Sequence, residues 1–242
     1  MGQLVDIETV DGIATITLNS PANRNALSQQ LLADLHTALD AAEQQNARVV
    51  VLAHAPPVFC SGADLKERAS GKVDSTPYVR AIERLGTTAA PVIAAVDGPV
   101  RAGGLGVMAA CDLVVVNSTI TFALTEVRIG VAPAIVSAPL LQRCGWSKLA
   151  AAYLTGAAFD AATALDMGLV THVVDDVAPT VAQLSRDILL GGPNAVAATK
   201  ALLRRPHTIA ELQILSESLF TSDEGREGMA AFAEKRAPRW AP

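Results

Sequence analysis

Residues 102–115, AGGLGVMAACDLVV, place three glycines directly before an apolar segment. Two kinds of chemistry use glycines in this way. Written as Gly104-x-Gly106-x-x-Ala109, the stretch matches the spacing of a loop that binds the pyrophosphate of a dinucleotide. Alternatively, Gly103 and Gly104 lack a β-carbon and so allow the carbonyl oxygen of a ligand to reach a backbone N–H. The two interpretations predict different enzymes.

The surrounding sequence argues against the dinucleotide. A pyrophosphate loop follows a strand directly, and an acidic residue ends the next strand, where it holds the ribose. The strand-like run at 92–96 ends several residues before Gly103, and the next one ends at Asn117, which is not acidic. Two strand-like runs and a turn separate Glu126 from the glycines. The pattern therefore favours a site for a carbonyl oxygen.

Glu126 is the strongest candidate for an acid or base. It lies in TFALTEVRIGV (121–131), where most of its neighbours are apolar. A carboxyl group partly removed from water has a raised pKa, which suits proton transfer near neutrality. The alternative is a structural carboxylate, paired with Arg128 or solvated at a strand end. Asp112, in the ACD motif, is interpreted as structural.

The elements that must position these residues alternate between strand and helix patterns. Two strand-like runs flank Asp11 and Gly12, a dipeptide typical of a tight hairpin turn, and Ser28 suits the N-cap of a helix. Apolar residues recur at helical spacing after it: Leu31, Leu32, Leu35, Ala38, Leu39 and Ala42. Further strands are predicted at 47–54, 91–98, 113–116, 119–124 and 169–174, a helix at 78–85, a loop at 56–67, and helices after Pro133 and from 195 onwards. The fold class is therefore α/β.

Composition excludes several classes of protein. Half of the 242 residues are hydrophobic and the net charge is −5, with no basic cluster interleaved with aromatic residues, so we expect no nucleic-acid or membrane partner. The N-terminus lacks the pattern of a signal peptide, and we expect a cytoplasmic protein. The three cysteines and four histidines are scattered, which predicts neither disulfides nor a metal site.

Six stretches together resemble the enoyl-CoA hydratase/isomerase (crotonase) superfamily. They occur in the family order along almost the whole chain: 19–27, 56–67, 96–115, 121–133, 154–170 and 224–240. The resemblance implies a crotonase-like spiral of β-β-α units over residues 1–190 and a C-terminal helical trimerisation region over 191–242. It implies homotrimers, often paired into hexamers, and an acyl-CoA thioester as substrate in fatty acid metabolism. Coenzyme A enters as part of that substrate, and no separate cofactor is expected.

The resemblance also implies roles for single residues. The thioester oxygen would accept hydrogen bonds from the N–H groups of Ala63 and Gly103, and Glu126 would be the catalytic acid/base. The remaining matches are to substrate- and coenzyme-binding positions: Arg24, Ala26, Ser61, Gly62, Asp64, Leu65, Lys66, Gly104, Gly106, Phe232 and Lys235. Of these, Phe232 and Lys235 match residues that often reach the coenzyme of a neighbouring subunit. Surface positions for Lys66 and Lys235 are the alternative.

The chain departs from the family pattern at two places. Hydratases of the family hold a water molecule between two glutamates, and the position of the second is Gly106 here. The run after Pro133 is AIVS rather than glycine-rich, which predicts a narrower acyl pocket. We therefore expect a Δ3,Δ2-enoyl-CoA isomerase or a weak hydratase, with a gain of hydration in Gly106→Glu where the geometry allows it. A thioester hydrolase or decarboxylase, or a non-catalytic acyl-CoA binder, are the alternatives.

Overall fold

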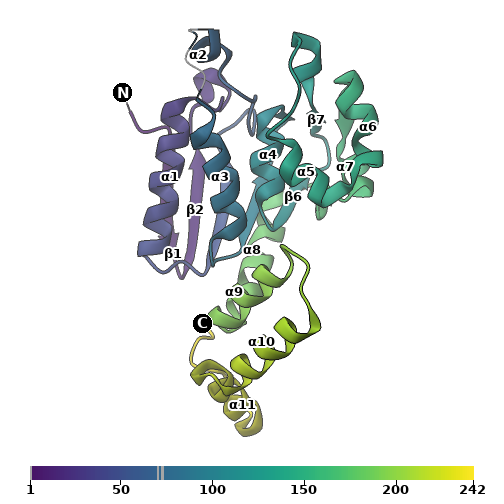
Figure 1. Cartoon of the computed structure of the whole chain (residues 1–242). Coiled ribbons are helices and arrows are strands. Elements are labelled where there is room, and N and C mark those ends of the chain that lie inside the picture. Colours follow the sequence, from purple (N-terminus) through teal and green to yellow (C-terminus); the bar gives the residue numbers. More distant parts are fainter. Residues whose placement is uncertain (1, 70, 72–73) are drawn as a thin grey trace.

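The two apolar runs around Asp11 and Gly12 form an antiparallel hairpin of β1 (Val5–Val10) and β2 (Ile13–Leu18). Both turn residues have positive φ, 50° for Asp11 and 78° for Gly12, as a tight hairpin turn requires. The structure is a computed structural model that describes residues 2–69, 71 and 74–242, and the hairpin is its first element (Figure 1). The sequence prediction of the hairpin is confirmed.

Four further strands extend this hairpin into a six-stranded sheet. They are β3 (Val49–His54), β4 (Val92–Val96), β6 (Leu113–Asn117) and β9 (His172–Val174), all parallel to β2, in the order β1-β2-β3-β4-β6-β9. The register aligns four fully buried residues across the sheet: Ile16, Leu52, Ala94 and Val114. Parallel strands need long crossover connections, and helices supply them here.

Helices cover both faces of the sheet. On one face lie α1 (Gln29–Gln44), α3 (Thr76–Thr87) and α4 (Gly103–Ala110), and on the other α8 (Val177–Leu189) (Figure 1). Alternate residues of β3 serve the two sides, since Val50 and Leu52 join the larger core and Val49 and Val51 pack with α8. Ser28 caps α1 as predicted, because its hydroxyl accepts from the Leu31 N–H at 3.1 Å.

A second, smaller sheet lies beside the site. It contains β5 (Val100–Arg101), β7 (Thr121–Ala123) and β8 (Phe159–Asp160), with β7 in the middle. The strand predicted over 119–124 is thus shorter than expected, and β5 and β8 are too short for a periodicity to reveal. The loop predicted over 56–67 ends in a short helix, α2 (Leu65–Ala69).

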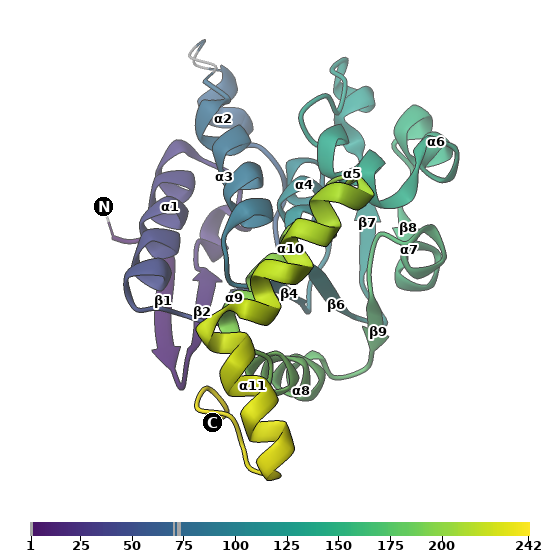
Figure 2. The same ribbon diagram turned by 60° about the horizontal axis from the view of Figure 1, so that its bottom comes forward.

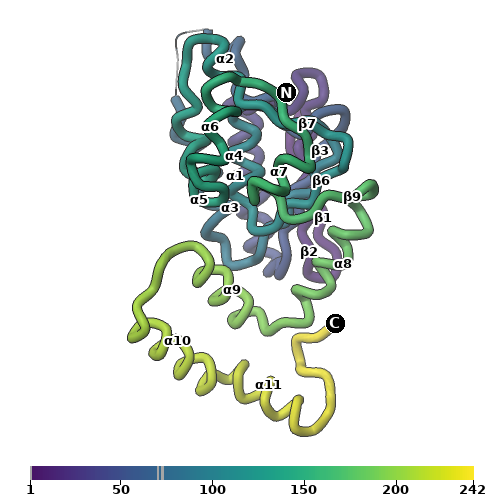
Figure 3. The backbone as a smooth tube through the Cα atoms, turned by 90° about the vertical axis from the view of Figure 1, so that its right-hand side faces the viewer, coloured from purple at the N-terminus to yellow at the C-terminus, as the bar shows by residue number. Residues whose placement is uncertain are grey.

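The remaining elements lead to a C-terminal helical arm. The chain also contains two short 3-10 helices, η1 (Pro21–Asn23) and η2 (Thr125–Ile129). After η2 come α5 (Ser137–Cys144), α6 (Trp146–Thr155) and α7 (Ala161–Met167). The arm is made of α9 (Pro193–Leu202), α10 (Ile209–Thr221) and α11 (Asp223–Glu234). In Figure 2, where this end of the molecule comes forward, α10 lies in front of the sheet and its covering helices, and Figure 3 shows that α10 and α11 extend away from them.

The arm is attached to the body through α9. Lys200, only 5% exposed, donates to the backbone oxygens of Leu85 and Ala90 and forms an ion pair with Asp112. The division of the chain into residues 1–190 and 191–242 stays a prediction. Over the described ranges, no helix is both long and apolar enough to cross a membrane, and no group of three or more His, Cys, Asp or Glu side chains could hold a metal ion.

Candidate active site

Three segments that are distant in the sequence lie side by side above the sheet: residues 23–27, 60–64 and 100–104. The Leu27 N–H donates to the Gly62 oxygen at 2.8 Å, and the Arg101 N–H donates to the Cys60 oxygen at 2.9 Å. Backbone hydrogen bonds of this kind fix the segments without using side chains. The predicted residues Ser61, Ala63 and Gly103 are thereby brought together.

The backbone has an unusual conformation just before each predicted N–H donor. Gly62, with φ of +95°, is in contact with Ala102, and a Cβ at position 62 would come within 2.7 Å of the Ala102 Cβ. Ala102 itself has φ of 49° and ψ of −126°, which residues with a Cβ rarely adopt. Ala63 and Gly103 follow these two residues, so the close contact holds their N–H groups near each other.

Neither of these N–H groups donates to an acceptor among the described residues. Gly103 is the first residue of α4, where backbone N–H groups have no partner within the helix and the helix dipole favours negative charge. Two free N–H groups that project from fixed backbone are suited to hold an oxygen that gains negative charge.

The structure explains Gly104 by packing within the protein rather than by space for a ligand, which the glycine pattern suggested. A Cβ at this position would lie 2.7 Å from the Cβ of Cys60, so only glycine lets α4 approach the 60–64 segment. Cys60 is fully buried below the loop, and its sulfur accepts from the Gly62 N–H at 3.4 Å. Burial raises the pKa of the Cys60 thiol to about 12.

Glu126 lies on η2, directly after β7, and its side chain is half-buried. Its Oε2 atom is buried and has no hydrogen-bond partner among the described residues. Burial raises the pKa of Glu126, and a hydrogen bond from its own backbone offsets this in part. Among the described residues no ion pair joins Arg128 to Glu126, and Arg128 donates instead to the Thr155 oxygen at 3.1 Å. The alternative of an ion pair between the two is therefore wrong.

A cavity of about 440 Å³ joins these groups. Ala63 and Gly103 line it together with Glu126, and Ser61 and Leu65 lie on its wall. Most of the remaining wall is apolar, and it includes residues of the run after Pro133 that departs from the family pattern. The apolar residues of this remaining wall are Leu27, Ala102, Ile129, Val131, Ala132, Pro133, Ala134, Ile135 and Val136. The cavity thus combines two backbone donors, one carboxyl group and an apolar wall.

Sequence reasoning missed Tyr78 and Arg68, which also line the cavity. Tyr78 is 7% exposed and its hydroxyl donates to the Gly103 oxygen at 2.7 Å. Gly106, in contrast, does not line the cavity. A Cβ built on it would overlap the Tyr78 hydroxyl, so a glutamate at this position requires Tyr78 to move, and the gain of hydration in Gly106→Glu stays a prediction.

Of the residues predicted to bind the coenzyme, Ser61 and Leu65 line the cavity, and the others are not part of its lining. Arg24 is exposed and Ala26 is buried, and the Arg24 oxygen accepts from the Ser61 N–H at 3.1 Å. Asp64 caps α2, since its Oδ1 accepts from the Lys66 N–H at 2.9 Å. The Lys66 side chain is exposed, so its ammonium group is free to meet an anionic ligand.

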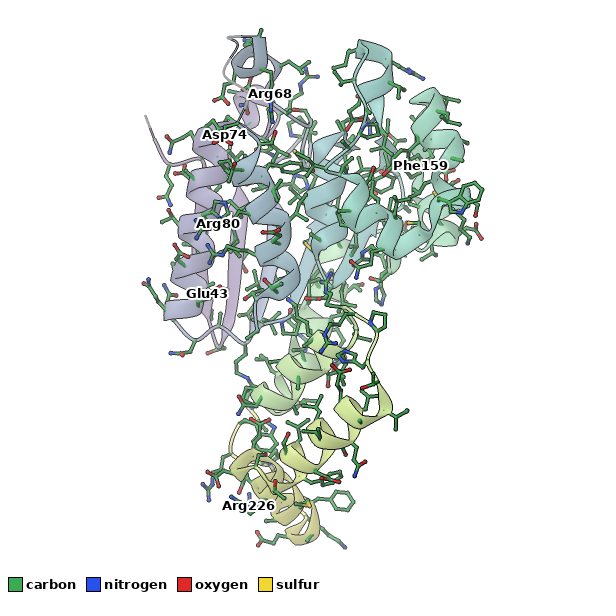
Figure 4. All side chains as sticks on the ribbon, viewed as in Figure 1. Glu43, Arg68, Asp74, Arg80, Phe159 and Arg226 are labelled. Carbon is green, nitrogen blue, oxygen red and sulfur yellow. The ribbon has the colours of Figure 1, made fainter. Side chains whose placement is uncertain are left out.

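Phe232 and Lys235 do not approach this cavity within one chain. Phe232 lies on α11 and Lys235 ends that helix, whereas Arg68 on the cavity wall belongs to α2. Figure 4 shows Arg68 at one end of the molecule and Arg226, on α11, at the opposite end. A contact of Phe232 or Lys235 with a ligand in such a cavity would therefore require a second copy of the chain.

Comparisons with known proteins agree with one another. The family model described as Enoyl-CoA hydratase/isomerase matches residues 8–242. The Mycobacterium leprae protein named "Probable enoyl-CoA hydratase echA8" is 34% identical over 251 residues, covering 97% of this chain and 98% of its own. Methylmalonyl-CoA decarboxylase of Escherichia coli is 31% identical and covers 98% of each chain. The crystal structure of an enoyl-CoA hydratase from Mycobacterium avium is 43% identical, covers 99% of this chain and 100% of its own, and has a TM-score of 0.76.

Proposed function

Because this chain belongs to the enoyl-CoA hydratase/isomerase family, we propose that it is an enzyme that binds an acyl-CoA thioester in the cavity and moves a proton with Glu126. The observation that carries the proposal is the unpartnered, buried Oε2 of Glu126 in a cavity lined by two backbone donors. A buried carboxyl oxygen without a partner is costly for stability, and such costs are typical of functional groups.

The chemistry follows from charge development on the thioester. When Glu126 takes a proton from the α-carbon, the electron pair of the C–H bond moves to the thioester oxygen and forms an enolate. The N–H groups of Ala63 and Gly103 stabilise this oxygen, and loss of one such donor typically removes about 3 kcal/mol of transition-state stabilisation. Return of the proton to the γ-carbon of a 3-enoyl thioester gives the 2-enoyl isomer. One carboxyl group is sufficient for both steps.

Isomerisation is better supported than hydration as the main reaction. Addition of water across the double bond benefits from a second group that holds the water. The position from which a second carboxylate would enter is Gly106, and Tyr78 covers it. We therefore propose a Δ3,Δ2-enoyl-CoA isomerase with weak hydratase activity.

Decarboxylation is the second candidate, and the Escherichia coli relative named methylmalonyl-CoA decarboxylase favours it. In that reaction the bond from the α-carbon to a carboxylate breaks, carbon dioxide leaves and the electron pair forms the same enolate. Glu126, whose pKa is raised, would deliver the proton in its acid form. This route needs the two N–H donors and no second carboxylate. Hydrolysis and binding without turnover are further outcomes of the experiment below.

The proposal includes the coenzyme and the assembly. Ser61 lines the cavity, and the exposed Arg24 and Lys66 are proposed to bind the coenzyme beside it. The arm exposes large apolar side chains, with Phe232 88% and Ile209 81% exposed, and burial of such groups is a driving force for association. We propose a homotrimer or a hexamer in which the Phe232 and Lys235 of one subunit approach the coenzyme of the next. Sedimentation in the presence and absence of the thioester measures this.

The reaction is tested by incubating the protein with acyl-CoA thioesters of different chain length and following the products by mass spectrometry and chromatography. A 3-enoyl thioester should give its 2-enoyl isomer without change in mass. Addition of water would increase the mass of a 2-enoyl substrate, and decarboxylation would decrease the mass of a malonyl-type substrate. Absence of turnover for all of them, with tight binding, would overturn the proposed enzyme in favour of a binding protein.

A further inference from the structure

Tyr78 lies between helix α3, on which it is carried, and the first turn of α4. It is buried and forms part of the cavity wall that also contains Glu126. Nothing in the sequence pattern around it, STPYVRAIERL, distinguishes it from an ordinary core residue of an amphipathic helix. Its importance comes from the two glycines of α4 that its hydroxyl contacts.

The first contact is with Gly103. The Tyr78 hydroxyl donates to the Gly103 oxygen at 2.7 Å, and a Cβ on Gly103 would lie 3.5 Å from the same hydroxyl. A glycine has more backbone freedom than any other residue. A hydrogen bond to its carbonyl anchors the first residue of α4 to α3 and so limits movement of the Cα to which the adjacent N–H group, the proposed donor to the thioester oxygen, is attached.

The second contact is with Gly106. A Cβ at this position would overlap the Tyr78 hydroxyl, and the next nearest atoms, of Val136 and Ile82, would be 3.1 and 3.3 Å away. Only the hydroxyl oxygen is therefore too close for a β-carbon. The presence of tyrosine at position 78 and the absence of a side chain at position 106 are two sides of one packing arrangement.

We propose that Tyr78 is a positioning residue that fixes the Gly103 N–H donor and, by occupying the space over Gly106, restricts the cavity to reactions that one carboxylate can catalyse. The inference rests on the proposed function for the role of Glu126 and of the Gly103 N–H. It adds that the reaction type is set by a side chain from α3, outside the three segments that form the rim of the site.

The protonation state of Tyr78 agrees with this role. Burial raises its pKa far above the usual value, and the nearby carboxyl of Glu126 contributes in the same direction. The hydroxyl therefore keeps its proton at physiological pH. It can hold the Gly103 carbonyl as a neutral donor, but it cannot take a proton from water as a second carboxylate would.

The first experiment removes the hydroxyl alone. Tyr78→Phe should lower kcat for the proposed isomerisation by about 3- to 10-fold, the effect of one lost neutral hydrogen bond, with KM changed less than twofold. Ser185→Ala is the matched control, because it also removes a buried hydroxyl that donates to a backbone oxygen, that of Val181 at 2.8 Å, but on α8, on the other face of the sheet. An unchanged kcat in Tyr78→Phe, or an equal loss in Ser185→Ala, would overturn the role in fixing Gly103.

The second experiment tests the packing relation by thermal unfolding and needs no turnover. Gly106→Ala should lower Tm by roughly 2–10 °C through overpacking, and Tyr78→Phe/Gly106→Ala should recover most of the loss. Gly86→Ala is the control for a helix glycine, since its added Cβ would be 3.7 Å from the nearest atom, in Arg204. A double variant no more stable than Gly106→Ala would overturn the packing relation.

The third experiment tests reaction type. Tyr78→Ala/Gly106→Glu opens the space and supplies a second carboxylate, and the ratio of hydrated to isomerised product should rise at least about tenfold over that of Tyr78→Ala. An unchanged ratio, with the double variant folded and able to bind the thioester, would overturn the restriction. If no thioester is turned over by the unmodified protein, the proposed function fails, whereas the unfolding experiment still decides the packing relation.

Discussion

The two ends of helix α4 hold carboxyl groups in opposite states. Beside its N-terminal end, the Oε2 of Glu126 is buried without a partner, and the N–H groups of Ala63 and Gly103 are free among the described residues. Just after its C-terminal end, both oxygens of Asp112 are occupied. Its Oδ2 accepts from Lys200 at 2.9 Å and from the Val92 N–H at 2.7 Å, and its Oδ1 pairs with Arg204.

The difference separates a carboxyl group that holds the fold from one that is available for chemistry. Asp112 joins β4, α9 and Arg204, two residues beyond the end of α9, so its removal leaves the buried ammonium group of Lys200 without a carboxylate. Among the described residues the Glu126 side chain forms no ion pair and is bonded only to its own backbone, so its removal leaves no other residue without a partner. A neutral substitution of Asp112 should therefore lower stability, whereas a neutral substitution of Glu126 should lower turnover.

The largest expected effect is on turnover at the N-terminal end. Glu126→Gln keeps the shape of the side chain but cannot exchange a proton, and it should lower turnover by about 10²- to 10⁴-fold. The melting temperature should stay the same or rise, because a buried charge without a partner is removed. Glu8→Gln, at an exposed position of β1, is the control. Retained turnover in Glu126→Gln would show that another group moves the proton.

At the C-terminal end, Asp112→Asn should lower the free energy of unfolding by about 3–5 kcal/mol, because Lys200 would be left buried and unpaired. The loss should lessen as pH rises, since burial already lowers the pKa of Lys200 and the neutral amine no longer needs a carboxylate. Chemical denaturation at several pH values measures both. Asp166→Asn, which removes an exposed partner of Lys148, should cost much less.

The pH dependence of activity should show the raised pKa of Glu126. Proton abstraction needs the ionised carboxyl, so kcat/KM, which reports the free protein, should rise with pH through a midpoint above the ordinary glutamate value of about 4.3. Tyr78 and Tyr153, which lie close to this carboxyl, have raised pKa values and do not titrate in that range. A midpoint at or below the ordinary value would contradict the buried environment.

The same shift has a consequence for stability. Because the folded protein binds the Glu126 proton more tightly than the unfolded chain does, the stabilisation is complete below the ordinary pKa and is lost as pH rises through the raised one. Glu126→Gln should remove this pH-dependent contribution to stability. Unfolding curves of the two proteins between pH 4 and 8 measure the difference.

The smallest effect on the free energy of unfolding is expected for Arg204, the more exposed of the two cations that pair with Asp112. Arg204 is 26% exposed, against 5% for Lys200, so water already solvates part of its charge. Arg204→Met should therefore cost about 1 kcal/mol of unfolding free energy, and Asp112 should stay paired with Lys200. A loss as large as that of Asp112→Asn would show that Arg204 carries the cluster.

Local signals predicted much of the fold. The Asp11-Gly12 turn and the Ser28 cap depend on neighbouring residues alone, and both are confirmed. The structural interpretation of Asp112 is confirmed by its ion pairs. Glu126 was identified by an apolar neighbourhood, and the structure places it in the cavity, on a 3-10 helix that the sequence patterns did not predict.

What the sequence did not reveal depends on contacts between distant segments. The overlap of Tyr78 with position 106 joins two helices, and no periodicity within either helix records it. The strand β5 has only two residues and exists because it pairs with β7. The positive φ of Ala102 is likewise set by its surroundings, because alanine gives no local reason for it.

The thiol beneath the site also limits which reactions can occur. Cys60 is fully buried behind the loop that would hold an electrophilic thioester carbon in the proposed function, and it does not line the cavity. Burial also raises the pKa of its thiol to about 12, so the sulfur stays protonated at physiological pH and is a poor nucleophile. In the proposed function the thiol would therefore stay inert, and the acyl chain would remain on coenzyme A.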